Sequence, residues 1–208
     1  IGGNGDDLFL FASASELAAD ATVIGGDNTD TIRMDTGANA LSLIDSDFTK
    51  VIEVEKLDLT GTGTQSVTLG TETNQAFASG MTLTTNATAT SLNLQGSSST
   101  VSVNATGTNN ADTMVGGSAA DTLVGGSGDD TITGNGGDDL MFGGAGDDVF
   151  EGASATDTVD GGENTDTLLL ASDYRADLGG GLFEGVADDH LTNIENVYVL
   201  SGAEIIVD

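Results

Sequence analysis

The chain contains no cysteine and no proline, and it has very few basic residues. Without cysteine, disulfides and thiolate metal sites are excluded, so an extracellular fold of this size needs another source of stability, such as a bound metal. Only four Lys and Arg stand against 34 Asp and Glu, which gives a formal net charge of −30. This charge excludes a nucleic-acid partner, because recognition of nucleic acid needs a basic face. No apolar run approaches the length of a membrane span, so no membrane insertion is expected.

The composition nevertheless favours a folded chain. Hydrophobic residues make up 38% of the sequence, and 31 glycines indicate many tight turns between short strands. A compact fold with this charge repels itself unless it binds cations. The chain starts without Met and inside a Gly-rich motif, so we expect it to be a fragment of a longer chain.

An acidic residue recurs every nine positions along the second half of the chain, and an apolar residue recurs two positions after each acid. A short fixed period of this kind predicts a solenoid, in which one repeat cannot bury its apolar side chain alone. The acids are Asp112, Asp121, Asp130, Asp139, Asp148, Asp157 and Asp166. The apolar residues are Met114, Leu123, Ile132, Met141, Phe150, Val159 and Leu168.

Each nine-residue frame reads Gly-Gly-x-Gly-x-Asp-x-hydrophobe-x, as at 125–133 and 143–151. The first six residues need a sharp turn, which glycine permits, and the last three form a minimal strand. Two frames make one coil of eighteen residues, so Asp112, Asp130, Asp148 and Asp166 stack on one edge. Asp121, Asp139 and Asp157 stack on the other, with rungs ~4.8 Å apart. Isolated frames at 2–10 and 25–33 add Asp7 and Asp30.

Carboxylates stacked this closely require counter-charge, and Ca2+ suits the gap because it accepts six to eight oxygens in flexible geometry. Mg2+ demands tighter octahedral geometry, and Zn2+ prefers His or Cys, of which the chain has only His190. We expect each of several Ca2+ ions to take Asp from two stacked loops and carbonyl oxygens from the turns. The candidate carbonyl donors are Gly116, Ser118, Gly125, Ser127, Gly128, Gly134, Gly136, Gly143 and Ala145.

The frames at 125 and 143 resemble the glycine- and aspartate-rich nonapeptide of RTX proteins. The resemblance covers 107–169 continuously and extends to the two outlying copies. It implies an all-β fold, a right-handed parallel β-roll or β-solenoid with calcium-binding turns. It also implies type I secretion of an unfolded chain that folds outside the cell, and hence a secreted or cell-surface location.

Departures from the pattern predict weaker or absent sites at 116–121 and 152–157, because Ala119 and Ala155 replace the fourth-position glycine. Asn110 and Asn164 at this position tolerate left-handed geometry better than Ala does. Asp129, Asp138 and Asp147 are expected to face solvent. The alternative is a ladder that caps the turns without metal, which the mutual repulsion of the carboxylates disfavours.

The sequence as a whole predicts four segments of one continuous solenoid. Residues 1–59 carry RTX-like loops and a β unit, and 60–106 form Thr/Ser-rich, metal-free rungs. Residues 107–169 form the nonapeptide β-roll, and 170–208 a second β unit related to 34–59. The nine-residue spacing of Leu83, Leu92 and Val101 predicts that the short pitch continues through the spacer. Short helical turns are expected at 15–19 and 48–51.

No catalytic set is recognisable, so we expect a protein that is not an enzyme. The first hypothesis is a calcium-dependent structural protein of the bacterial cell surface, of the S-layer type, which self-associates into a lattice or filament. Other parts of the full chain would then anchor it to cell-surface polysaccharide. The second is the calcium-binding export module of a secreted RTX hydrolase or toxin. The Asp-poor spacer between duplicated units favours the structural role.

Overall fold

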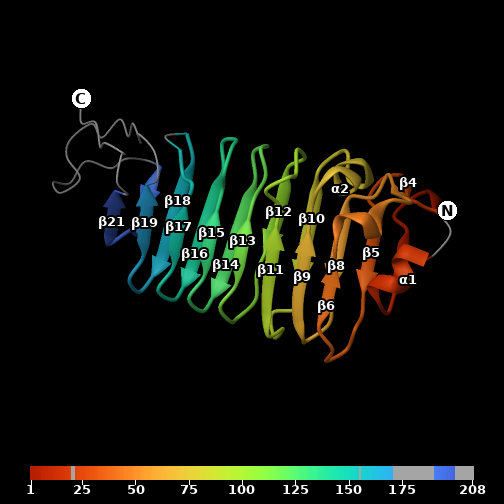
Figure 1. The fold of residues 1–208 in the computed structure, drawn as a ribbon, viewed down its shortest axis with the longest axis horizontal. Coiled ribbons are helices and arrows are strands. Elements are labelled where there is room, and N and C mark those ends of the chain that lie inside the picture. Colours follow the sequence, from red (N-terminus) through yellow and green to blue (C-terminus); the bar gives the residue numbers. More distant parts are fainter. Residues whose placement is uncertain (20–21, 155, 171–189, 200–208) are drawn as a thin grey trace.

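The computed structural model describes residues 1–19, 22–154, 156–170 and 190–199, and shows two parallel β-sheets wound into a solenoid. Figure 1 shows the coils stacked along the long axis, from the N-terminal end at the right to β21 (Asn196–Val199) at the left. From residue 31 onward the chain alternates between the two sheets, so each coil there places one strand in each. All the strand pairs in both sheets are parallel, which confirms the expected β-roll architecture.

Among the described residues, one sheet has nine strands and the other has eight. The nine-stranded sheet contains β2 (Leu8–Phe11), β5 (Thr31–Met34), β8 (Lys56–Leu59), β10 (Met81–Thr85), β12 (Val103–Thr106), β14 (Thr122–Ser127), β16 (Leu140–Ala145), β18 (Thr158–Glu163) and β20 (Leu191–Thr192). The eight-stranded sheet contains β6 (Leu41–Leu43), β9 (Thr64–Thr68), β11 (Ser91–Gln95), β13 (Thr113–Val115), β15 (Thr131–Thr133), β17 (Val149–Glu151), β19 (Thr167–Leu170) and β21 (Asn196–Val199).

In the described part of the N-terminal half there are two smaller strand pairs and three helices. The small pairs are β1 (Gly3–Asn4) with β4 (Gly26–Asp27) and β3 (Val23–Ile24) with β7 (Val51–Ile52). The helices are α1 (Ala14–Ala19), the 3-10 helix η1 (Asp45–Phe48) and α2 (Thr71–Ala76). Two of them lie close to the predicted turns, whereas α2 was not predicted. Within the described residues, no helix has the length and apolar character needed to cross a membrane.

The apolar row of the sequence forms the core between the two sheets. Met114, Ile132, Phe150 and Leu168 come from the eight-stranded sheet, and Leu123, Met141 and Val159 come from the opposite one. All seven side chains are completely buried. The core continues without a break into the N-terminal coils through Leu94, Leu83, Leu57 and Ile32.

The coil length is 18 residues only where the Gly-rich frames repeat. Thr113 pairs with Thr131, and Thr131 with Val149. In the spacer, Leu83 pairs with Ala105 rather than Val101, and Leu94 pairs with Met114, so the prediction of an unchanged pitch is wrong there. The turns of the spacer are longer than the Gly-rich turns, and they contain additional buried residues such as Ala89 and Ser99.

Replacing Phe150 with Ala should lower the free energy of unfolding by about 3–5 kcal/mol, because it removes a fully buried ring and leaves a cavity. Glu151→Ala on the same strand is the control, since its side chain is exposed and a surface change costs roughly 0.5 kcal/mol or less. Urea unfolding of both variants in saturating calcium measures the difference. Equal losses in the two variants would contradict the assignment of Phe150 to the core.

Candidate metal centre

The Asp side chains stack along the two edges of the solenoid, as the spacing predicted. Edge A consists of the turns that lead into the eight-stranded sheet, and edge B of those that lead into the nine-stranded sheet. On edge A the amide of each Asp donates to Oδ1 of the Asp one coil later, from Asp112 to Asp130, from Asp130 to Asp148 and from Asp148 to Asp166, each at 2.8 Å. Each Asp therefore joins two coils through a charge-assisted hydrogen bond.

Edge B repeats this arrangement with the other Asp residues. The Asp121 amide donates to Asp139 Oδ1 and the Asp139 amide to Asp157 Oδ1, both at 2.9 Å. At the N-terminal end of the same edge, the Asp7 amide donates to Asp30 Oδ1 at 2.8 Å. Of these carboxylates, all but that of the half-buried Asp7 are buried. The contact that builds the ladder in 107–169 therefore recurs, as a separate ladder, between the outlying copies at 2–10 and 25–33.

The second carboxylate oxygen, Oδ2, divides the loops into two kinds. In six loops it is buried and accepts no hydrogen bond, and we call these open loops: 2–7, 25–30, 125–130, 134–139, 143–148 and 161–166. In the self-capped loops, which are 107–112, 116–121 and 152–157, a backbone amide of the same loop donates to Oδ2. The donors are Thr108, Gly117 at 2.6 Å and Ser154 at 2.6 Å.

Backbone conformation explains the difference between the two kinds. Every open loop has positive φ at its second and fourth positions, supplied for example by Gly126 (121°) and Gly128 (101°). Asn takes one of these positions in three loops, as Asn28 (85°), Asn135 (72°) and Asn164 (89°). Loops 107–112 and 116–121 have no residue with positive φ, and their second-position amide turns toward the Asp. Glycine or Asn at these two positions therefore leaves Oδ2 without a donor.

In the open loops the amides bond to the neighbouring coil instead. The Gly3 amide donates to the Gly25 carbonyl at 2.9 Å. Strand pairing on edge A likewise continues into the turns, where Gly126 pairs with Gly144 and Gly144 with Gly162. The loops are thus held to one another by their backbones while their carboxylates stay partly unpaired.

A carbonyl oxygen faces several of these unpaired carboxylate oxygens. A Cβ added to Gly125 would collide with both Asp130 Oδ2 and the Gly143 carbonyl oxygen. The same cradle recurs at Gly143, between Asp148 Oδ2 and the Gly161 carbonyl oxygen. Two acceptors that face each other without a donor repel, and a hard cation such as Ca2+, which binds carboxylate and carbonyl oxygens, relieves the repulsion. The residues present therefore fit calcium.

The other predicted carbonyl donors differ in whether they face a carboxylate or already accept a hydrogen bond. The Gly134 carbonyl faces Asp121 Oδ2, and the Gly125 carbonyl faces Asp112 Oδ2. Both of these carboxylate oxygens already accept an amide of their own loop. The Ala145 carbonyl accepts the Gly128 amide at 2.7 Å, and the Gly116 carbonyl accepts the Asn135 side chain at 3.0 Å.

Three more candidates lie within the turns, and their role as donors stays a prediction. Ser127 pairs with Ala145, the Gly136 amide donates to the Gly117 carbonyl at 3.2 Å, and Ser118 lies in a self-capped loop.

No group of three or more His, Cys, Asp or Glu side chains converges on one point among the described residues. A bound ion would therefore depend on backbone carbonyls and water for many of its ligands. This agrees with the ligand type that the Gly-rich turns predict, and it disfavours metals that prefer side-chain nitrogen or sulfur.

The acids just before the ladder also take part in the turn stack. Asp129 and Asp147 are exposed, as expected, but the Asp147 amide donates to Asp129 Oδ1 and the Thr165 amide donates to Asp147 Oδ1, both at 3.0 Å. Asp6 accepts from the Thr29 amide in the same way at 3.1 Å. These side chains tie together the tips of neighbouring loops.

Burial makes the ladder carboxyls difficult to ionise when no cation is bound. It raises the pKa of Asp130 to about 7, and the charges of Asp112, Asp148 and Asp129 add to the effect. Burial likewise raises the pKa of Asp139 and of Asp148 to about 6. It also raises the pKa values of Asp112, Asp121 and Asp166.

A comparison with protein families identifies a repeat in the central loops. The family model for the RTX calcium-binding nonapeptide repeat (4 copies) matches residues 106–141 and 133–168. No curated protein and no solved structure matches the chain. The match covers the seven ladder acids, whereas the open loops at 2–7 and 25–30 lie outside it.

In the absence of calcium, acidification should stabilise the fold. A raised pKa means that the folded state binds protons more tightly than the unfolded state, whose Asp value is 3.8. Stability is therefore greatest below about pH 4 and falls as the pH rises through about 7. Far-UV circular dichroism in excess chelator should show β structure increasing from neutral to acid pH, with light scattering as the control for aggregation. Loss of β structure on acidification would contradict this prediction.

Replacing Ala119 with Gly should convert loop 116–121 into an open loop, because Gly117 already occupies its second position. In chelator the variant should lose about 0.5–1 kcal/mol, the usual cost of glycine. At ~1 mM calcium it should gain about 0.4–1.4 kcal/mol more than the wild type does, the value of one extra site. Ala120→Gly is the matched control, and urea unfolding in both conditions measures the gain. Equal calcium-dependent gains in both variants would contradict the role of the fourth position.

Proposed function

Because the chain carries RTX calcium-binding nonapeptide repeats over residues 106–168, we propose that it is a calcium-dependent structural protein of the bacterial cell surface. RTX repeats of this kind bind several calcium ions and are typical of secreted proteins. The observation that supports the proposal most is the set of buried, unpaired carboxylate oxygens in the open loops. They make the fold itself depend on a cation.

The continuity of the solenoid supports a structural role. Both sheets run from the N-terminal coils through the Thr/Ser-rich spacer into the RTX block and on to β20 and β21. The repeats are therefore part of one long scaffold instead of a separate module. A long rigid element with short exposed strands suits a surface layer or matrix better than an export signal.

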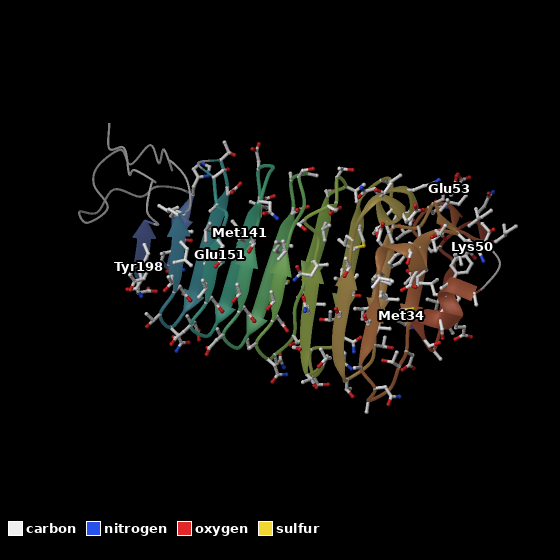
Figure 2. All side chains as sticks on the ribbon, viewed as in Figure 1. Met34, Lys50, Glu53, Met141, Glu151 and Tyr198 are labelled. Atoms are coloured by element: carbon white, nitrogen blue, oxygen red, sulfur yellow. The ribbon has the colours of Figure 1, made fainter. Side chains whose placement is uncertain are left out.

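Charge and exposed apolar residues support self-association. Two copies with a formal charge of −30 each repel strongly, so divalent cations are needed to bring them together. Apolar side chains are exposed toward both ends of the described solenoid, Leu10 on β2 at 63% and Tyr198 on β21 at 57%. Figure 2 shows Tyr198 at the end opposite Glu53. We propose that copies assemble into a lattice or filament once calcium has folded them.

The size of the calcium contribution to folding stability favours folding outside the cell. Extracellular calcium modules bind with dissociation constants of ~0.1–1 mM, so each site contributes about 0.4–1.4 kcal/mol at ~1 mM calcium. Several sites together reach a few kcal/mol, a large share of the stability of a marginal domain. At cytosolic calcium concentrations the contribution is negligible, which is compatible with secretion of an unfolded chain by a type I system.

The alternative is an export and folding module of a secreted RTX hydrolase or toxin. In this case the chain would fold with calcium but remain monomeric, and a catalytic domain would lie elsewhere in the full protein. We propose that the segment itself is not an enzyme, because it has no cysteine and only one histidine, His190, which is exposed beside Thr158.

Calcium titration of the purified chain tests the proposal. We expect cooperative gain of β structure by circular dichroism, followed by light scattering and ordered sheets or filaments in electron micrographs. Magnesium should substitute poorly, because it demands octahedral geometry and retains its water.

Asp130→Asn, which keeps the oxygen that accepts the Asp112 amide, should weaken calcium binding at least about 10-fold. Asp129→Asn is the control.

Three outcomes decide between the hypotheses. Ordered assembly with calcium supports the structural protein, whereas a folded monomer supports the export module. A chain that is already fully folded in excess chelator at neutral pH would show that calcium does not control this fold.

A further inference from the structure

Both duplicated units contain a short connector that replaces the Gly-rich turn of the next coil. We call residues 53–55 and 193–195 the Glu connectors. Each begins with a non-glycine residue in the left-handed region, Glu53 with φ of 55° and Asn193 with φ of 52°. Each ends in a glutamate two positions before an inward-facing strand residue, Leu57 or Val197. This is the place that Asp takes in the nonapeptide frames.

The two glutamates extend the acid ladders. Glu55 Oε2 accepts the Asp30 amide at 2.9 Å on edge B, and Glu195 Oε2 accepts the Asp166 amide at 2.7 Å on edge A. A longer side chain is needed here because a three-residue connector stands in place of a six-residue loop. The ladders therefore run from Asp7 through Asp30 to Glu55 and from Asp112 through Asp166 to Glu195.

The loop that precedes each connector has a buried acceptor with no donor. Oδ2 of Asp30 and Oδ2 of Asp166 are buried without a hydrogen-bond partner, and both side chains are completely buried. A Cβ on Gly25 would collide with Asp30 Oδ2 and with the Glu53 carbonyl oxygen. A Cβ on Gly161 would collide with Asp166 Oδ2 and with the Asn193 carbonyl oxygen. The left-handed residue thus presents its carbonyl to the unpaired carboxylate oxygen.

We propose that each Glu connector completes a calcium site with the open loop before it, and this inference rests on the calcium dependence proposed above. One site uses Asp30, the Glu53 carbonyl and Glu55, and the other uses Asp166, the Asn193 carbonyl and Glu195. All the donors are hard oxygens, which calcium prefers. The two sites lie toward opposite ends of the described solenoid, with Glu53 at one end and Tyr198, three residues after Glu195, at the other (Figure 2). Neither glutamate lies within the residues matched to the RTX repeat.

Glu→Gln variants of the full chain test these sites. Glu55→Gln and Glu195→Gln keep an oxygen that can accept the Asp amide, so the ladders stay intact while one ligand charge is lost. Each variant should weaken the binding of one calcium ion at least about 10-fold. The number of ions bound and their affinities are measured by isothermal titration calorimetry and native mass spectrometry with calcium alone.

Asp27→Asn and Glu163→Gln are the matched controls, because both side chains are exposed at the third position of the two open loops and should leave calcium binding unchanged. If the wild type binds calcium and Asp130→Asn weakens it, but the Glu55 and Glu195 variants bind like the wild type, the connector sites are ruled out. If the wild type binds no calcium, the proposed function itself fails. Should one glutamate variant not fold, the other tests the same geometry independently.

Discussion

The structure depends on the carboxylates of the ladder Asp residues, whose two oxygens differ in their hydrogen bonding. One oxygen of each ladder Asp accepts the amide of the preceding coil, which fixes the distance and register of neighbouring turns. The other oxygen is buried, and in the open loops no group of the protein satisfies it. An ionised carboxylate buried in this way is costly unless it is paired. In the open loops one buried side chain therefore aligns the coils through Oδ1 and leaves Oδ2 available to a cation, so stacking and metal binding involve the same residue.

The self-capped loops show how the same fold avoids this need. In loops 107–112, 116–121 and 152–157 an amide of the loop itself reaches the carboxylate. The turn then resembles an ordinary Asp-capped turn, and the coil stays in register without a bound ion. Left-handed residues at the second and fourth positions separate the open loops from loops 107–112 and 116–121, so the glycine and Asn pattern sets where Oδ2 is left unpaired.

Much of this arrangement could be predicted from the sequence, because a nine-residue period leaves little freedom. It indicated the division of the Asp row between two edges and the buried row from Met114 to Leu168. It also singled out loop 116–121, whose Asp is capped by the Gly117 amide, while the weaker calcium site expected there stays a prediction. Three features could not be predicted from it. The capping amide of Thr108 depends on backbone geometry, and the shifted pairing of Leu83 with Ala105 depends on spacer turns that have no repeat. Glu55 and Glu195 were not predicted because they lie outside any Gly-rich frame and carry Glu in place of Asp, although their position two residues before a core residue was a usable signal.

The pairing of two frames in each eighteen-residue coil limits how the length of such a chain can change. Removing or duplicating eighteen residues within 107–169 takes out or adds one complete coil, and every later strand stays in its own sheet. A nine-residue change keeps the inward direction of each apolar side chain but transfers all later strands to the opposite sheet, including the edge on which Asp166 meets Glu195. Variation in length among chains of this design should therefore occur in whole coils, and single frames should be tolerated only where nothing downstream depends on the edge.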